Sequence, residues 1–437
     1  MKVALKYGSE ESFNIKRQTD YAVKGITKVC KKIGPRQPGS PEELRAQKWF
    51  EKDMKNYCEE TSIEEFTVHR HGFMGFIPFT VACGVVSVFV NWFSSPIAAF
   101  ILCILAFVPL LFEFLMYKEF DDFLFPKQTS HNMIANRKPT GETKQRIIMI
   151  GHSDSQYEWT INYLIGGLQA KLFVEIPAVV GLVIQTVVAL FSIIMGAVEG
   201  TNAAAKDIET VHTLFLVLFI VSIVFIPFEL SFLFFQSWTK SVPGASDNLS
   251  GCYVAMGTVK ALDEAGVRFE NTEVTVICSG SEEAGLRGAK AYAKKHEQEL
   301  KDVPTIVVAL DTFRDLETMA VYDRDLSGTV QHHKGTKELV HDACANCGFD
   351  VKYESIYIGG CDAAAFTQRK IPATGFAAMD PAPPRYYHTR LDTPENLRPE
   401  AIEAGIEIMV EACCMFDKYG AEGVTEDFAG FEDIEDM

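Results

Sequence analysis

Two adjacent glutamates, Glu282 and Glu283, stand where the apolar run "TEVTVIC" gives way to "AGLRGAKAYAKK", a stretch typical of a helix. Two buried like charges are costly unless a cation offsets them or one of them stays protonated. The pair therefore indicates a site at the end of a buried strand that binds a cation or transfers a proton.

Other acids and imidazoles follow apolar runs in the same way. His152 and Asp154 come after "IIMIG", and Asp311 comes after "VVAL". Asp247 lies in the turn "GASDNLSG", and His388 lies in "YYHTRLDT". Each alone is an ordinary turn residue. Together they offer the nitrogen and oxygen ligands that suit zinc or a similar divalent ion, and a shared carboxylate suits two ions.

The segments between these residues predict an α/β fold. Continuous apolar strands such as "QRIIMIG", "EVTVICS" and "TIVVAL" alternate with amphipathic helices such as "NLSGCYVAMGTVKALDEAG". This pattern describes a mostly parallel sheet with helices on both faces. Ligands of such sheets bind at the C-terminal ends of the strands, where the acids and imidazoles fall.

Four long stretches lack the charge that the rest of the chain carries. No charged residue occurs from Gly72 to Phe112, a length about twice the roughly 20 residues that span a bilayer, and "NWFSSP" divides it into two spans. Two more apolar stretches begin at Ile176 and Thr213. We therefore expect two transmembrane hairpins, 72–117 and 170–238, inserted into a discontinuous catalytic domain made of 1–71, 118–169 and 239–437. The alternative is a very apolar soluble core. An acidic C-terminal tail is expected at 421–437.

Charge and cysteine content place the chain in the cell. The segments flanking the hairpins carry "KVCKKIGPRQPG" and "NRKPTGETKQR", whereas the opposite turns are uncharged or acidic. This excess of Lys and Arg predicts a multi-pass membrane protein with a cytoplasmic catalytic domain, and the membrane is the plasma membrane if the protein is prokaryotic. The absence of a signal-peptide pattern and the eleven scattered cysteines agree with that side. The net charge of −17 argues against nucleic acid as a partner, and the long uncharged stretches indicate the lipid bilayer as one.

The order of these motifs resembles a known family. "GPRQPGSPEE", "HNMIANRK", "GHSDS", "GASDNLSG", "SGSEEAGLRGAKAY", "ALD", "CDAAAFTQRKIPATGF" and "YHTRLDT" follow the order seen in metallopeptidase family 28, the dizinc aminopeptidases and glutamate carboxypeptidase-like zinc exopeptidases. The resemblance covers nearly all of the sequence outside the hairpins. It implies a three-layer αβα zinc-exopeptidase domain.

The resemblance also implies the site residues. It implies two Zn²⁺ per chain, with other divalent metals as alternatives, held by His152, Asp247, Glu283, Asp311 and His388. Asp247 would bridge the ions, with His152 and Asp311 on one and Glu283 and His388 on the other. Asp154 would orient the imidazole of His152. Glu282 would be the general base, and Tyr387 would help hold the oxyanion, with Tyr386 competing for that role.

Several departures from the family pattern leave alternatives open. Ser153 replaces the usual aromatic or aliphatic residue, Ala363 replaces a common histidine, and the two hairpins flank the "GHSDS" motif. The first interpretation is a membrane-anchored aminopeptidase with a peptide substrate. The alternatives are a single-zinc glutaminyl-cyclase-like acyltransferase and a non-catalytic membrane scaffold. The hairpins would anchor the domain, join two copies in a homodimer, or admit apolar substrates.

Overall fold

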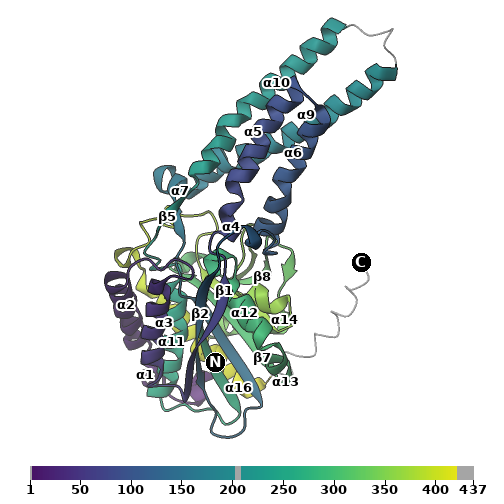
Figure 1. Ribbon diagram of the computed structural model, residues 1–437. Coiled ribbons are helices and arrows are strands. Elements are labelled where there is room, and N and C mark those ends of the chain that lie inside the picture. The colour runs from purple at the N-terminus through teal and green to yellow at the C-terminus, as the bar shows by residue number, and fades with distance from the viewer. Residues whose placement is uncertain (1, 202–207, 421–437) are drawn as a thin grey trace.

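The structure is a computed structural model that describes residues 2–201 and 208–420. It consists of a sheet domain and a bundle of long helices that rises from one end of it (Figure 1). The predicted acidic tail, 421–437, lies outside the described residues, as does part of the turn of the second hairpin.

A nine-stranded sheet forms the centre of the domain. Its order is β1-β2-β6-β3-β7-β11-β8-β10, with β9 paired to β8. The pairs from β6 to β11 through β3 and β7 are parallel, and β1, β2 and β8 join antiparallel. The strands are β1 (Glu60–Val68), β2 (Gln128–Arg137), β3 (Gln145–His152), β6 (Thr272–Ser279), β7 (Thr305–Phe313), β8 (Met319–Asp325), β9 (Val330–Gln331), β10 (Lys352–Ser355) and β11 (Ala373–Ala378).

Helices cover both faces of this sheet. One layer comprises α2 (Ile15–Lys32), α3 (Pro41–Met54), α11 (Leu249–Glu264), α14 (Lys334–Asn346) and α16 (Pro399–Tyr419). The other comprises α12 (Arg287–Lys295), α13 (Glu297–Asp302) and α15 (Ala363–Thr367). Along β3, Ile147 and Met149 pack into the first layer and Ile148 and Ile150 into the second, because successive strand residues point to opposite faces. The predicted three-layer α/β fold with a mixed, mostly parallel sheet is confirmed.

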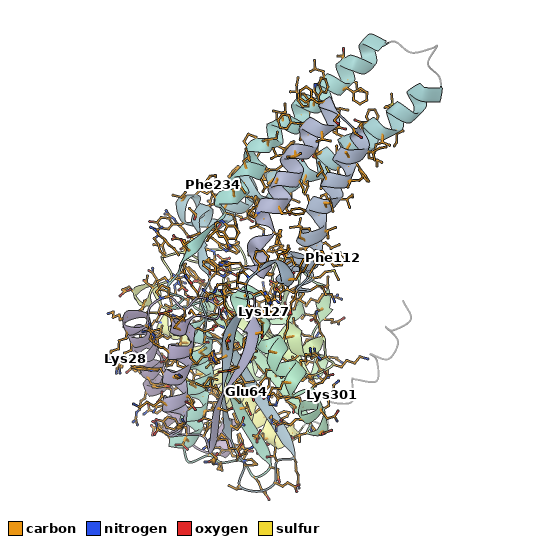
Figure 2. All side chains as sticks on the ribbon, in the orientation of Figure 1. Lys28, Glu64, Phe112, Lys127, Phe234 and Lys301 are labelled. Atoms are coloured by element: carbon orange, nitrogen blue, oxygen red, sulfur yellow. The ribbon has the colours of Figure 1, made fainter. Side chains whose placement is uncertain are left out.

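Four helices are long and apolar enough to cross a membrane: Gly72–Phe93, Pro96–Leu115, Gly167–Gly196 and Thr213–Phe234. They contain α4 (Gly72–Gly75), α5 (Ile77–Phe93), α6 (Pro96–Pro109), α8 (Gly167–Ala170), α9 (Ile176–Thr201) and α10 (Ile208–Ser231). Phe112 and Phe234 mark the base of this bundle (Figure 2). Many of their large apolar side chains are exposed, which a soluble protein of this size rarely tolerates over so large a surface.

An apolar cluster joins the bundle to the sheet domain. Phe73, Met74, Ile77 and Tyr117 of the first hairpin pack with Leu286, Leu326 and Ala364 of the sheet domain, and Phe235, after the second hairpin, belongs to the same cluster. The second hairpin leaves the domain through a small antiparallel sheet, β4 (Tyr157–Trp159) with β5 (Gln236–Ser241), and α7 (Thr160–Ile165) follows β4. Both hairpins therefore emerge from the same end of the sheet domain (Figure 1).

Candidate active site

The structure brings the predicted ligands together around Asp247. His152, the last residue of β3, places Nε2 3.1 Å from Oδ1 of Asp247. His388 places Nε2 2.9 Å from the other oxygen, Oδ2. One carboxylate therefore faces two imidazoles with one oxygen each, which is the arrangement that a bridging ligand requires.

The remaining two ligands complete two groups. His152 Nε2 lies 3.9 Å from Asp311 Oδ1, and His388 Nε2 lies 3.4 Å from Glu283 Oε1. The ligand atoms of His152, Asp247 and Asp311 lie within 4.8 Å of one another, as do those of Asp247, Glu283 and His388. Asp247 is common to both groups, so the predicted ligand sets correspond to two adjacent places where an ion would fit.

Asp154 contacts three of the other predicted site residues. Its Oδ1 accepts a hydrogen bond from the backbone N–H of Glu282 at 3.1 Å, and its Oδ2 accepts one from Glu283 at 3.1 Å. The same Oδ1 lies 3.4 Å from Nδ1 of His152. Asp154 thus holds the strand-end turn that carries both glutamates, a contact that its predicted role of orienting His152 did not include.

Tyr386 and Tyr387 make different contacts. Tyr386 donates its hydroxyl hydrogen to Asp315 at 2.7 Å, away from the predicted ligands. The ring of Tyr387 stacks on the His388 imidazole, with centroids 3.8 Å apart and planes at 22°. The carboxylates that raise the pKa of Tyr387, after burial, are Asp247, Glu283, Asp311 and Glu282. Tyr387 is therefore the tyrosine beside the site.

Two residues absent from the predicted set hold the turn of Asp247. Asp392 accepts hydrogen bonds from the backbone N–H groups of Ser246 (2.8 Å) and Asp247 (3.0 Å). The side chain of Asn248 donates to Leu310 O at 2.8 Å and accepts from Thr312 N at 3.2 Å. Asp392 lies inside the motif "YHTRLDT", so its place in a motif with His388 was the one sequence signal for it.

Arg36 and Gln156 tie further loops to the site. The buried guanidinium of Arg36 donates to the carbonyls of Ser153 (2.7 Å) and Gly244 (2.9 Å), and so connects the loop after β3 to the turn before Asp247. Gln156 donates to Glu283 Oε2 at 2.7 Å. Arg36 had been noted only as part of a motif, and no sequence pattern marked Gln156.

The two residues that depart from the family pattern, Ser153 and Ala363, are buried. Ser153 is fully buried, with its hydroxyl bonded to Ser279 O at 2.8 Å and to the amide of Gln47 at 2.9 Å. Ala363 is also fully buried, at the start of α15. Neither side chain is exposed to a bound substrate, so their effect on substrate choice is indirect.

The electrostatics of the site fit a divalent metal. Among the described residues, the ion pairs of Asp247, Glu282, Glu283 and Asp311 are with imidazoles, not with Lys or Arg. Burial, and then the neighbouring carboxylates, raise the pKa of Glu282 and Glu283, and burial raises that of Asp311 to about 6. Glu283 Oε1 is buried without a hydrogen-bond partner. An excess of buried carboxylate with an unsatisfied oxygen is what a bound cation would compensate.

Residues at the bases of both hairpins lie beside the candidate active site. Trp159 of β4 contacts the His388 imidazole edge-on at 4.4 Å between centroids, and its backbone N–H donates to His388 O at 2.8 Å. Phe235, which follows the second hairpin, packs on Trp159 at 4.7 Å. Tyr117, at the end of the first hairpin, is buried; burial raises its pKa first, and the charge of Glu282 raises it further.

A buried arginine joins the first hairpin to the turn of the two glutamates. Arg287 donates to Ala284 O at 2.8 Å and makes a bidentate pair with Asp122 at 2.6 and 2.8 Å. It also reaches Glu113 at 3.2 Å and Glu119 at 3.0 Å. We call Arg287 with these three acids the clasp. The clasp connects the end of the first hairpin to residues directly after Glu283.

Asp121 lies beside the clasp and gives it a pH dependence. Burial, followed by the charges of Glu113 and Asp122, raises its pKa to about 7, although Arg287 opposes the rise. A raised carboxyl pKa means stability that is complete below the ordinary pKa near 4 and lost as the pH rises through about 7. We expect Asp121→Asn to be more stable than the wild type by about 1 kcal/mol near pH 8, with the difference vanishing near pH 4. Thermal unfolding of the detergent-solubilised chain at both pH values measures this.

Asp122→Asn is the matched control for that prediction. It removes the charge of one of the three acidic partners of Arg287 and should destabilise the protein near pH 8. A lower stability of Asp121→Asn near pH 8 would show that Asp121 serves the clasp as a charged group.

The comparisons with known proteins agree with this geometry. Residues 234–413 match the model of peptidase family M28. Because this segment lies largely within the sheet domain, we call that domain the M28 domain. The match includes Asp247, Glu282, Glu283, Asp311 and His388, whereas His152 and Asp154 precede it. The M28 domain makes the chain a hydrolase of the metallopeptidase class, and zinc is the metal that this assignment implies.

Solved structures with a similar fold include aminopeptidases and a glutaminyl cyclase. The M28 domain with its insertions is similar to the aminopeptidase from Aneurinibacillus sp. strain AM-1, with a TM-score of 0.52, 15% identity and coverage of 93% of this chain and 95% of that one. It is similar to BSAP, a zinc aminopeptidase from Bacillus subtilis (0.51, 14%, 92% and 94%). It is also similar to Fimbriiglobus ruber glutaminyl cyclase (0.52, 14%, 91% and 95%). No curated protein matches the chain in sequence.

Proposed function

We propose that the chain is a membrane-anchored dizinc exopeptidase of the aminopeptidase type. The observation that carries the proposal is the pair of ligand groups that share Asp247. His152 and Asp311 would hold one zinc and Glu283 and His388 the other. The unsatisfied oxygen of Glu283 and the lack of a Lys or Arg partner within the described cluster support this assignment.

When bound, the two ions would lower the pKa of water and polarise the carbonyl of the peptide bond that is cut. Glu282 places Oε2 3.8 Å from His152 Nε2, on the side of the ligand cluster, and belongs to neither of the two ligand groups that share Asp247. It takes the proton from the attacking water and delivers it to the leaving amine. Its raised pKa, caused first by burial, suits a group that gains and loses a proton in each turnover.

The other residues of the site position these groups. Asp154 keeps Glu282 and Glu283 in their relative places through their backbone N–H groups. The ring of Tyr387 is held against His388. Its hydroxyl group would donate a hydrogen bond to the carbonyl oxygen of the substrate, which becomes negative as the water attacks.

Substrate screening with metal analysis tests the proposal. The purified full-length chain is assayed against aminoacyl, N-acyl and γ-glutamyl amides. We expect release of the N-terminal residue from aminoacyl amides, its loss on chelation, and its return with zinc. Asp247→Asn should bind two fewer zinc equivalents than the wild type. A wild-type chain that binds both zinc equivalents and hydrolyses no amide would contradict the proposal.

A glutaminyl-cyclase activity is the second candidate, because a glutaminyl cyclase is among the structures that share the fold. The two functions differ in metal content and in product. A difference of one zinc equivalent between the wild type and Asp247→Asn, together with cyclisation of N-terminal glutamine, would favour the cyclase.

The apolar helices support a place in the membrane. We propose that the four helices cross a bilayer as two hairpins, with lipid as the main partner of their exposed faces, and that the M28 domain lies on the cytoplasmic side. A homodimer through these helices remains a proposal that light scattering in detergent would test. Protease treatment of intact cells carrying a tag after Met437 tests the orientation, and cleavage of the tag in intact cells would reverse it.

A further inference from the structure

A second group of metal-ligating side chains lies in the M28 domain apart from the site described above. It consists of Asp325 at the end of β8, His332 just after β9, and Cys361 just before α15. His332 Nε2 lies 3.3 Å from Asp325 Oδ2, and Cys361 Sγ lies 2.9 Å from the same oxygen. All three residues are buried, and their ligand atoms lie within 4.8 Å of one another.

Other contacts hold each side chain from its far side. His332 Nδ1 lies 2.9 Å from Thr367 Oγ1, so that Nε2 is the ring nitrogen directed at the group. Asp325 Oδ1 accepts hydrogen bonds from the backbone N–H of Leu326 at 2.6 Å and of Cys361 at 3.2 Å. Metal sites commonly have such outer contacts, because they fix the orientation of the ligands before the ion binds.

The backbone places both His332 and Cys361 close to Asp325. β8 and β9 form an antiparallel hairpin in which Asp325 pairs with Val330. His332, two residues after Val330, lies opposite Asp323 and on the same face as Asp325, so its ring reaches Asp325 diagonally. Gly360 precedes Cys361, and a Cβ at Gly360 would lie 2.5 Å from Leu326 Cδ2 and 3.2 Å from Asp325 Oδ1. A side chain at residue 360 would therefore have to displace the buried Leu326 side chain and would crowd Asp325.

The donor set is specific in its chemistry. One thiolate, one imidazole and one carboxylate suit zinc and similar divalent transition metals, and a tetrahedral ion would take a water as its fourth ligand. Magnesium and calcium prefer oxygen ligands alone. We propose that Asp325, His332 and Cys361 bind one divalent transition-metal ion of the zinc class, separate from the ions at Asp247.

This ion would be structural. Cys361 is followed directly by Asp362, whose Oδ2 accepts a hydrogen bond from Ser279 Oγ at 2.5 Å. Ser279 is the last residue of β6, just before the turn of Glu282. An ion bound to Cys361 would fix this turn against the strand end. The proposal does not depend on the peptidase activity, because none of its ligands is a predicted ligand of the catalytic ions.

Cobalt substitution of the full-length chain tests the proposal through its sulfur. A thiolate bound to Co²⁺ gives a near-ultraviolet charge-transfer band, and the predicted catalytic ligands contain no sulfur. We expect the band in the cobalt-loaded wild type, its absence in Cys361→Ser, and one metal equivalent less in that variant. Asp247→Asn should lose the catalytic ions and keep the band, which separates this test from that of the proposed function.

Two further variants keep the result decisive. Cys344→Ser replaces a buried thiol that belongs to no metal-ligating group among the described residues, and it should retain the band. His332→Gln retains the thiol, so if Cys361→Ser fails to fold, a weakened and shifted band with one equivalent less metal in His332→Gln supports the site. A wild type without a thiolate band, or a band that persists in a folded Cys361→Ser, would overturn the proposal.

Discussion

Glu282→Gln is expected to abolish amide hydrolysis and leave the metal bound. The substitution keeps the size of the side chain and removes the group that takes the proton, whereas the five predicted ligands remain. General acid–base groups contribute about 10²- to 10⁴-fold to rate, so kcat should fall by about that factor. Steady-state kinetics with metal analysis of the same preparation measures both quantities.

Glu283→Gln is the matched control, since it changes the adjacent residue in the same way. Glu283 faces His388 at 3.4 Å and is a predicted ligand, so this variant should lose metal together with activity. A Glu282→Gln enzyme with activity close to that of the wild type would mean that another group takes the proton. Loss of metal in Glu282→Gln would instead make Glu282 a ligand.

Arg287→Met is expected to destabilise the protein by about 3 kcal/mol. The guanidinium is buried with the nearly fully buried Glu113, and its removal leaves the acids of the clasp without their cation. Breaking a buried ion pair from one side costs about 3–5 kcal/mol, and the partial exposure of Asp122 places the expected value at the lower end. Because Arg287 also bonds Ala284 O, kcat should fall as well. Thermal unfolding in detergent and kinetics measure the two effects.

Arg45→Met is the control for the loss of an arginine. Arg45 pairs with Glu42 on the surface at 3.0 Å, and such pairs contribute about 0–1 kcal/mol. Arg287→Lys keeps the charge without the bidentate fork and should fall between the wild type and Arg287→Met. Equal stability of Arg287→Met and Arg45→Met would show that the clasp does not hold the hairpin to the M28 domain.

The sequence by itself determined the fold class, the family and the set of residues to examine. Apolar β-branched runs that end at or a few residues before His152, Glu283 or Asp311 predict both a buried strand and a polar group near its C-terminal end, because strand direction and side-chain alternation are local properties. The long uncharged stretches predicted the four apolar helices for a similarly local reason, since length and lack of charge are read directly from the chain.

The tertiary structure alone decided which oxygen faces which imidazole and what holds each ligand. Gln156 donates to Glu283 across 127 positions of the chain, and Asp392 binds the backbone of Asp247 across 145. Arg287 joins Glu113 across 174 positions, and Cys361 meets Asp325 across 36. The hydrophobic periodicity of the sequence does not predict such contacts. They depend on how strands far apart in sequence become neighbours in one sheet, and burial then gives each polar group a partner that its own segment does not contain.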